Sequence, residues 1–351
     1  MTIPDIEAVV ADNTADDGEG ERSVSPTLRL LLGLVALVVG TVLIVVSLGV
    51  LVDTTAEVRI VVGLAGLAAW YVGLDLIGKW IFGPRFETDL WLACAWVAIV
   101  VLAAVFADLL PLAEARNVSE TLRTPSLLRP DLFSGHPLGT DRQGLDVLGG
   151  VVYGARVSLV VSVGAVIIGM VIGGTIGLAA GYYRGKAEGV VNLFTDSMLA
   201  FPPLILLLGM VAVFSPSVRN VTVALAILGI PTYIRLARAN TLVFAQREFV
   251  IAARGVGEKN AAIMRRELLP NVILPVLSYG FIVVAVLIVA EASLSFLGLS
   301  VKPPTPTWGN MIAAGQESFE RHPHVVFTPG AVLFLTVFAF NRIGDKARQL
   351  W

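Results

Sequence analysis

Long apolar runs alternate with short polar segments along this chain of 351 residues. A helix needs about 20 apolar residues to cross the roughly 30 Å hydrocarbon core of a bilayer. Eight runs reach that length, although Asp196, Pro202, Pro203 and Pro231 interrupt the fifth and sixth. The runs occupy residues 28–52, 60–83, 90–113, 155–182, 193–214, 220–240, 272–298 and 325–344. The pattern therefore predicts an all-α polytopic membrane protein with about eight transmembrane helices.

The composition agrees with a membrane protein and excludes some functions. Hydrophobic residues make up 56% of the chain and charged residues only 15%, whereas soluble domains carry about 25% charged residues. A net charge of −2 argues against nucleic acid as a partner. The single cysteine, Cys94, permits no intrachain disulfide, and we expect a buried thiol at this position.

Positive charge predicts the orientation, because Lys and Arg concentrate in cytoplasmic segments. With the N-terminus inside, 16 of the 25 Lys and Arg residues fall on the inner side, where the loops are also shorter. We therefore expect both termini in the cytoplasm of a multi-pass plasma-membrane protein. Residues 1–27 are polar and acidic, and we expect them to form a disordered cytoplasmic tail.

A polar island of residues 246–275 separates the sixth and seventh apolar runs and faces the cytoplasm in this topology. Its pattern predicts two short helices, 246–256 and 259–268, joined by a turn at Gly257, which tolerates a positive φ. Pro270 is expected to end the second helix before the next span begins. The alternative interpretation is a surface helix lying among the lipid headgroups.

Small residues recur every four positions along the fourth run, at Ala165, Gly169, Gly173, Gly177 and Gly181. This spacing places them on one helix face, where another helix can approach closely. We expect a tightly packed interface, either within the chain or with a second subunit. A glycine-rich span without a special partner is the alternative.

Ionisable residues inside apolar runs are candidates for function. Asp196 and Glu291 are possible pathway or gating residues, although an interfacial or helix-pairing role accounts for Glu291 equally well. The chain has three histidines, without helical spacing or a supporting acidic cluster, and we expect no metal site. The stretch AGYYRGKAE lacks the first glycine and the hydroxyl residue of a phosphate-binding loop, so any ATP must bind to another polypeptide.

The polar island resembles the cytoplasmic motif of binding-protein-dependent ABC importer permeases. In that motif Glu-Ala-Ala is followed, after three residues, by Gly and, after nine more, by Ile-x-Leu-Pro. The chain matches the motif at Ala252, Ala253, Gly257, Leu269 and Pro270. It departs from the motif where Ile251 replaces the usual Glu and Glu267 the usual Ile.

Further motifs resemble the C-type permease subunit of dipeptide, oligopeptide and nickel importers. They lie between residues 135 and 348 and read HPLGTDRQGLDVL, YGARVSL, DSMLAFPPL, EASLSFLGLSVKPPTPTWGNM and FNRIGDKAR. Such subunits have one span before the HPLGTD segment, whereas this chain has three. We therefore divide the chain into an extra pair of spans (28–83), a first core span (90–113), an extracellular loop (114–150) and a permease core (151–351).

The resemblance implies a type I ABC importer permease with no catalytic residues of its own. Its partners would be a B-type permease subunit, two cytoplasmic ATPase subunits that bind ATP and magnesium, and an extracellular solute-binding protein. The coupling loop, residues 241–271, would dock on an ATPase: Ala252 and Ala253 would allow close approach, and Arg254, Arg265 and Arg266 would pair with acidic partner residues. The outer segments 136–148 and 302–310 would receive the binding protein.

Three alternatives remain beside a peptide importer. The first is the same machinery importing nickel or another small solute, because the binding protein sets much of the selectivity. A membrane scaffold that docks a soluble protein without transport is a second alternative. A membrane-embedded enzyme is disfavoured, because the sequence contains no Ser-Lys pair, paired aspartates or His-Glu-x-x-His arrangement within its spans.

Overall fold

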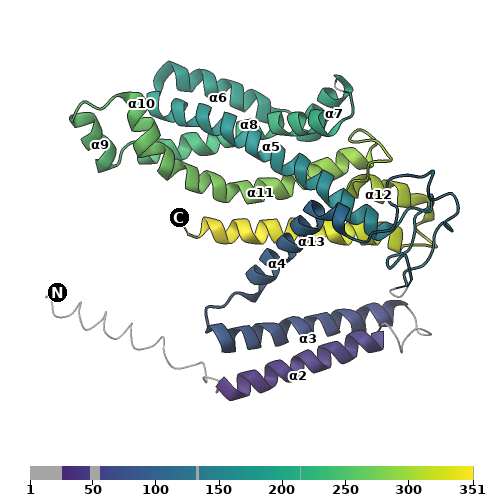
Figure 1. The fold of residues 1–351 in the computed structure, drawn as a ribbon. Helices are drawn as coiled ribbons and strands as arrows, with labels where there is room; N and C mark the ends of the chain where they lie inside the picture. Colours follow the sequence, from purple (N-terminus) through teal and green to yellow (C-terminus); the bar gives the residue numbers. More distant parts are fainter. Residues whose placement is uncertain (1–25, 48–55, 132–133, 214, 351) are drawn as a thin grey trace. The chain divides into compact units, whose positions relative to one another are not determined.

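The computed structural model describes residues 26–47, 56–131, 134–213 and 215–350. These residues form helices and connecting loops, and their only bridge of β type is an isolated pairing of Thr140 with Asp146. The predicted all-α membrane fold is confirmed (Figure 1). The acidic tail that the sequence predicts lies outside the described residues, apart from its last two positions.

The chain divides into two compact units, Met1–Asp89 and Leu90–Trp351. In the first unit, α2 (Pro26–Val45) and α3 (Ala56–Phe82) pack as a hairpin. Glycines allow their close contact, because a Cβ atom on Gly40 would lie 2.8 Å from the carbonyl oxygen of Gly66. The boundary between the units falls within the first turn of α4 (Thr88–Val105).

The second unit contains the remaining described α-helices and three short turns of 3-10 or π type. In chain order these are α4 (Thr88–Val105), η3 (Ala107–Leu109), α5 (Val147–Tyr183), α6 (Gly185–Ala200), α7 (Pro203–Val213), α8 (Val218–Phe244), α9 (Glu248–Gly255), α10 (Asn260–Ile263), η4 (Met264–Leu268), α11 (Leu269–Phe296), α12 (Trp308–Gly315), η5 (Gln316–Ser318) and α13 (His324–Arg348).

Seven helices in the described residues are long and apolar enough to cross a membrane, and α6 with α7 makes an eighth candidate. The fifth predicted span is not one straight helix, because α6 and α7 meet at an angle of 89°. Pro202 and Pro203 explain this break, since proline disfavours a helical residue before it and cannot donate a backbone hydrogen bond.

Two other predicted spans have different bounds in the structure. The third ends at Val105 rather than at residue 113, and Arg156 of α5 caps it by donating to the carbonyl oxygens of Ala104 at 2.7 Å and Val105 at 3.2 Å. The fourth begins at Val147 rather than at residue 155. Asp146 caps its N-terminus by accepting a hydrogen bond of 2.7 Å from the amide of Gly149.

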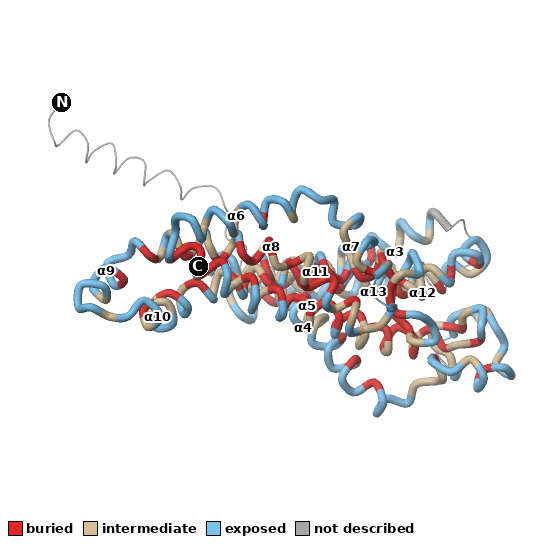
Figure 2. Tube along the Cα trace, turned by 90° about the horizontal axis from the view of Figure 1, so that it is seen from above, coloured by how far each residue is buried: buried red, intermediate tan, exposed pale blue. Residues whose placement is uncertain are grey.

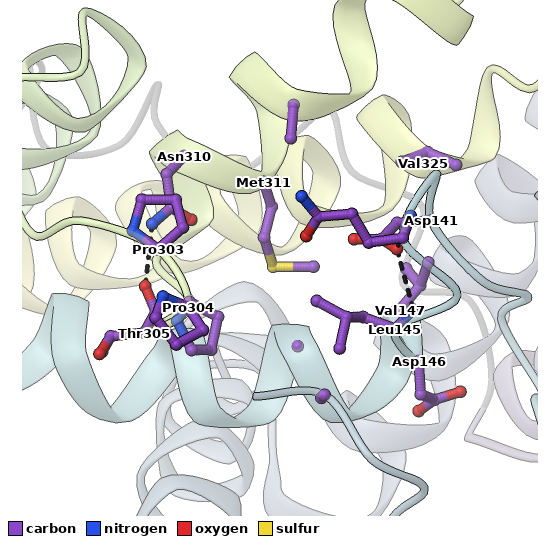
Figure 3. A pocket seen from close by; sticks show the side chains of 15 residues that line it. Asp141, Leu145, Asp146, Val147, Pro303, Pro304, Thr305, Asn310, Met311 and Val325 are labelled. Atoms are coloured by element: carbon purple, nitrogen blue, oxygen red, sulfur yellow. Dashed lines mark hydrogen bonds between the residues drawn. The ribbon is translucent and has the colours of Figure 1, made fainter. Parts of the chain in front are cut away.

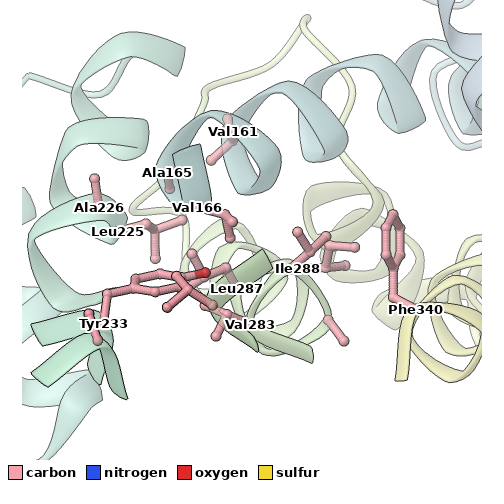
Figure 4. Close-up of a cluster of buried hydrophobic side chains, with 14 of the residues drawn as sticks. Val161, Ala165, Val166, Leu225, Ala226, Tyr233, Val283, Leu287, Ile288 and Phe340 are labelled. Atoms are coloured by element: carbon pink, nitrogen blue, oxygen red, sulfur yellow. The ribbon is translucent and has the colours of Figure 1, made fainter. Parts of the chain in front are cut away.

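The core of the second unit lies where α5, α8, α11 and α13 meet. Figure 4 shows the ring of Tyr233 from α8 reaching toward Leu287 and Val283 of α11, beneath Leu225. Phe340 of α13 lies beside Ile288 on the other side of α11. These helices therefore share one close-packed apolar core, in which each volume change affects several neighbours.

The two ends of the second unit differ in structure. α9 and the turn that follows it form an exposed limb at one end, while α12 and the loops of residues 107–146 lie at the other (Figures 1 and 2). α5, α8, α11 and α13 run between these ends. Cys94 on α4 is exposed, so the prediction of a buried thiol is wrong for the isolated chain. An apolar helix face of this kind is stable against lipid as well as against protein.

Candidate functional site

The polar island folds into the α8–α11 loop (residues 245–268), which contains α9, α10 and η4. Gly257 follows α9 with φ of 79°, a left-handed conformation in which a β-carbon is disfavoured. Its amide donates to the carbonyl oxygen of Arg254 at 3.0 Å, and the amide of Glu258 donates to that of Ala253 at 3.1 Å. This pair of bonds is the Schellman arrangement that ends a helix and reverses the chain.

The second limb of the loop runs directly into α11. The prediction that Pro270 ends a separate helix is wrong, because residues 260–296 form one continuous helix. Pro270 lies in the first turn of α11, immediately after the π-helical turn η4, in which the amide of Leu269 donates to the carbonyl oxygen of Met264. The wider turn accommodates a proline whose missing N–H would interrupt a regular α-helix. The second limb of the loop is therefore joined to α11 without an intervening segment of irregular chain.

The loop is anchored to the helix bundle by apolar and polar contacts. Val250, Ile263 and Leu268 are fully buried. The hydroxyl of Tyr182, near the end of α5, donates to the side-chain oxygen of Asn260 at 2.8 Å. Arg254 lies over the ring of the same tyrosine, with its guanidinium carbon 4.9 Å from the ring centroid. These contacts connect both limbs of the loop to α5.

Apolar and small side chains are exposed at the tip of the loop. Val256 is 84% exposed and Ile251 is 57% exposed. Among the predicted coupling residues, Ala252, Arg254, Gly257, Arg265, Arg266, Leu269 and Pro270 are exposed, and Ala253 is half-buried. Arg266 lies 3.6 Å from Glu258 within the loop, so this arginine already has an acidic neighbour. A protruding, partly apolar tip without large side chains at its centre is suited to contact another protein.

The predicted glycine face of α5 packs against α8 within the chain. A Cβ atom on Gly173 would lie 2.6 Å from the carbonyl oxygen of Ile230, and one on Gly177 would lie 2.4 Å from that of Ile234. Gly181 is similarly close to Arg238 and Thr241, and Gly169 has a looser contact of 3.4 Å with the carbonyl oxygen of Ala226. The loop following α8 is thus attached to a helix held closely against α5.

Asp196 and Glu291 lie in different environments. Asp196 on α6 is 65% exposed and forms an ion pair of 2.7 Å with Arg235 of α8. Glu291 on α11 is fully buried, and its carboxylate accepts hydrogen bonds from three serines. These donors are Ser158 of α5 at 3.0 Å, Ser295 at 2.7 Å and Ser300 at 3.2 Å. Glu291 therefore joins α5, α11 and the loop before α12 at the end of the bundle opposite the α8–α11 loop.

Segments 136–148 and 302–310, which the sequence predicts on the outer side, are far apart in sequence and line one pocket at that opposite end. Figure 3 shows Met311 pointing into its centre, between the prolines 303 and 304 and the loop that carries Leu145. Burial raises the pKa of Asp141, against the effect of hydrogen bonds that its carboxylate accepts from the amides of Leu145 and Gln143. Arg142 also pairs with Glu317, which follows α12. The two segments form one structured surface.

Sequence reasoning missed several residues of these sites. Tyr182 and Asn260 lie 78 positions apart, and only the adjacency of a tyrosine to the end of a predicted span hinted at a role for the first. The ion pair between Glu188 of α6 and Arg238 of α8 was also not anticipated. Neither contact has a periodic signal in the sequence. The described residues contain no group of three or more His, Cys, Asp and Glu side chains placed to hold a metal ion.

Residues 173–347 match the family described as "Binding-protein-dependent transport system inner membrane component". The chain is 36% identical over 254 residues to "Glutathione transport system permease protein GsiD" of Pectobacterium atrosepticum, covering 72% of this chain and 83% of that protein. It is 36% identical over 249 residues to "Dipeptide transport system permease protein DppC" of Alkalihalophilus pseudofirmus, covering 71% and 80%. A solved structure titled as inward-facing MetNI methionine ABC transporter aligns with a TM-score of 0.46 and 20% identity, over 57% of this chain and 95% of that one.

Proposed function

The chain belongs to the family of binding-protein-dependent transport system inner-membrane components, and from this premise we propose that it is a permease subunit of an ATP-driven peptide importer. The family membership carries the transport function. The proposed cargo class rests on relatives named as dipeptide and glutathione transport system permeases. The chain itself performs no catalysis in this proposal.

The proposed complex contains this chain, a B-type permease subunit, two cytoplasmic ATPase subunits and an extracellular solute-binding protein. ATP and magnesium bind to the ATPase subunits. The α8–α11 loop inserts its tip into a groove on an ATPase, with Val256 and Ile251 providing apolar contact. Arg265 is exposed in the same loop and is available to an acidic partner residue.

ATP-driven closure of the two ATPases moves the loops of the two permeases toward each other. Because η4 continues into α11 and Tyr182 connects the loop to α5, this displacement passes into both helices. The pathway then opens to the outside, and ATP hydrolysis restores the inward-open state. ATP shifts the transporter toward the outward-open state because ATP binds more tightly to the closed state of the ATPases. The outer surface formed by segments 136–148 and 302–310 receives the loaded binding protein.

The proposed orientation in the plasma membrane places both termini and the α8–α11 loop in the cytoplasm. The charge distribution supports it, since the inner segments carry most of the Lys and Arg residues. Nickel or another small solute is the second candidate for the cargo. It retains the same coupling mechanism, because the binding protein selects the solute.

A cross-linking experiment tests both the orientation and the docking. Cys94 is the only cysteine, so Cys94→Ser gives a background without thiols. Val256→Cys then places one thiol at the tip of the α8–α11 loop. We expect this thiol to cross-link to a co-expressed ATPase subunit, and to react with a membrane-impermeant maleimide only after the cells are permeabilised.

The matched control is Leu122→Cys in the same background. Leu122 is 80% exposed, close to the 84% of Val256, but it lies in the loop at the opposite end of the second unit. We expect it to react with the maleimide in intact cells and to form no cross-link to the ATPase. The inverse labelling pattern would overturn the orientation. A Val256→Cys thiol that is cytoplasmic but cross-links to no ATPase would favour a scaffold without transport.

A further inference from the structure

A pocket of about 680 Å³ lies between the end of α8, the start of α11 and the end of α13. It adjoins the α8–α11 loop, because Arg247, which lines it, immediately precedes α9. Arg348, the last residue of α13, also lines it. The coupling mechanism above assigns no role to this pocket.

The pocket is lined by both cationic and apolar side chains, including Val243 and Phe244 at the end of α8. Arg247, Asn271 and Arg348 are placed near the ends of their helices, whereas Leu274 and Pro275 follow deeper along α11. Tyr279 is eight residues beyond Asn271, which corresponds to about 12 Å along a helix axis. The lining thus combines the two guanidinium groups with apolar surface on α8 and α11.

The two arginines lack partners within the described residues. Neither guanidinium forms an ion pair or side-chain hydrogen bond there, and no acidic side chain lines the pocket. By contrast, Arg235 and Arg238 on α8 are paired with Asp196 and Glu188. Two unpaired guanidinium groups at one pocket produce a positive potential that an anion would neutralise.

Two amide side chains add hydrogen-bonding capacity to the same pocket. Asn240 donates to the carbonyl oxygen of Leu236 at 2.9 Å, and Asn271 donates to that of Glu267 at 2.6 Å. Each of these bonds uses one hydrogen of the amide group, so a second hydrogen remains for a ligand. The lining therefore offers a ligand two guanidinium groups and two neutral amide donors.

We propose that this pocket binds the phosphate headgroup of an anionic phospholipid from the inner leaflet. Guanidinium groups bind phosphate oxygens through paired, charge-assisted hydrogen bonds, and the apolar residues beyond them accommodate the start of the acyl chains. Basic pockets between transmembrane helices on the cytoplasmic side suit such headgroups. Free phosphate shares the headgroup chemistry but makes no use of the apolar part of the lining.

The inference rests on the proposed orientation, which places the pocket at the inner leaflet. A bound lipid would neutralise Arg247 and hold the end of α8, the start of α11 and α13 together beside the α8–α11 loop. Its consequence is that the position of the loop depends on the lipid composition of the inner leaflet. Lipid retention is a property of the full-length chain alone and needs neither nucleotide nor binding protein.

The test measures phospholipid retained by the purified full-length chain, using native mass spectrometry after delipidation and addition of phosphatidylglycerol or phosphatidylcholine. We expect the wild type to retain phosphatidylglycerol preferentially. The double variant Arg247→Gln with Arg348→Gln should retain about tenfold less phosphatidylglycerol than the wild type, because both charge-assisted contacts are removed. The matched control, Arg123→Gln with Arg219→Gln, removes the same charge at exposed positions outside the pocket and should retain the lipid.

A second double variant, Arg247→Lys with Arg348→Lys, preserves the charge in case the glutamine variant does not fold. It should retain an intermediate amount, since lysine cannot form the two parallel bonds of arginine. Equal lipid retention by the glutamine variant and its control would overturn the proposal. Displacement of phosphatidylglycerol by millimolar inorganic phosphate would instead identify a free-phosphate site and overturn the lipid assignment. Failure of either kind leaves the cross-linking test of the transport function unaffected.

Discussion

The carbonyl oxygen of Ile234 lies 2.4 Å from the position that a Cβ atom on Gly177 would occupy. This distance is shorter than any ordinary contact of a β-carbon, so α5 and α8 must separate when a side chain is added. We predict that Gly177→Ala lowers the stability of the purified chain by about 1–3 kcal/mol, the usual cost of overpacking. Thermal unfolding in detergent, followed by circular dichroism, measures the effect.

Gly174 provides the matched control on the same helix. A Cβ atom there would meet nothing within 4 Å, and the residue has no positive φ. Gly174→Ala should leave the unfolding midpoint unchanged or raise it slightly, because alanine stabilises a helix interior by about 0.5–1 kcal/mol relative to glycine. Equal loss of stability in both variants would show that helix packing is not the cause.

The sequence predicts a structural feature correctly where a local pattern of residues specifies it. The four-residue spacing of small residues in α5 identifies one helix face, and the structure pairs that face with α8. The proline pair at 202–203 indicated an interruption, but the 89° angle depends on how α6 and α7 pack. Pro270 was misinterpreted, because a sequence does not show that a π-helical turn will accommodate it.

Long-range polar contacts were beyond sequence reasoning. Ser158 and Glu291 are 133 positions apart and meet only because α5 packs against α11. Tyr182 meets Asn260 for a similar reason. Serine, tyrosine and asparagine are too common for single occurrences to predict such partners. The candidate loop could therefore be located from its motif, whereas the residues that anchor it required the fold.

The two ion pairs between α6 and α8 should differ in strength. Both side chains of the Arg235–Asp196 pair are more than half exposed, whereas those of the Arg238–Glu188 pair are 24% and 23% exposed. Exposed pairs contribute about 0–1 kcal/mol because water and salt screen them. We predict a larger coupling energy for Arg238 with Glu188 in double-mutant cycles that use Arg→Gln and carboxylate→amide changes. A larger coupling for the exposed pair would contradict this ranking.

If Asp196 serves the pathway, its removal should alter transport more than folding. Because its ion pair is exposed, we expect Asp196→Asn to change the unfolding free energy by less than about 1 kcal/mol. Uptake by the assembled transporter, compared with the unfolding midpoint of the same variant, separates these effects. Normal uptake together with normal stability would exclude a gating role for Asp196.

Glu291 should be required for stability at the end of the bundle opposite the α8–α11 loop. Glu291→Ala removes the acceptor for Ser158, Ser295 and Ser300 and leaves a cavity, which should cost about 2–5 kcal/mol. Glu291→Gln keeps the shape of the side chain and one acceptor oxygen, so this variant should lose less stability than Glu291→Ala. Chemical unfolding of the purified variants measures both. Glu320→Ala, at an exposed position, is the control and should change stability by less than about 0.5 kcal/mol.

Gly257 should be required for coupling more than for folding. Its φ of 79° costs a non-glycine residue about 1–2 kcal/mol, and a β-branched residue more. We predict that Gly257→Val abolishes the ATP hydrolysis stimulated by loaded binding protein in the reconstituted transporter. Gly189→Val on α6 is the control, because Gly189 is exposed, has no positive φ, has open space around it and lies outside the α8–α11 loop. Unchanged stimulation in Gly257→Val would argue against force transmission through this turn.

Glu114 should give the loop between η3 and α5 a stability that is lost in acid. The backbone amide of Arg116 donates to its carboxylate at 2.7 Å, with further bonds from Asn117 and Ala115, and together these lower the pKa of Glu114 below 4.5. A lowered folded-state pKa means that the contribution is complete above pH 4.5 and is lost as the pH falls through the lowered value. We therefore predict that the difference in unfolding midpoint between wild type and Glu114→Gln is largest near neutral pH and decreases below pH 4.5. Half-buried Asp141 has the opposite dependence, because its raised pKa makes ionisation destabilising, so the pH profile of the wild type alone mixes the two effects. The comparison with Glu114→Gln cancels the Asp141 contribution, and a difference that stays constant from pH 7 to pH 3 would contradict the assigned role of the carboxylate.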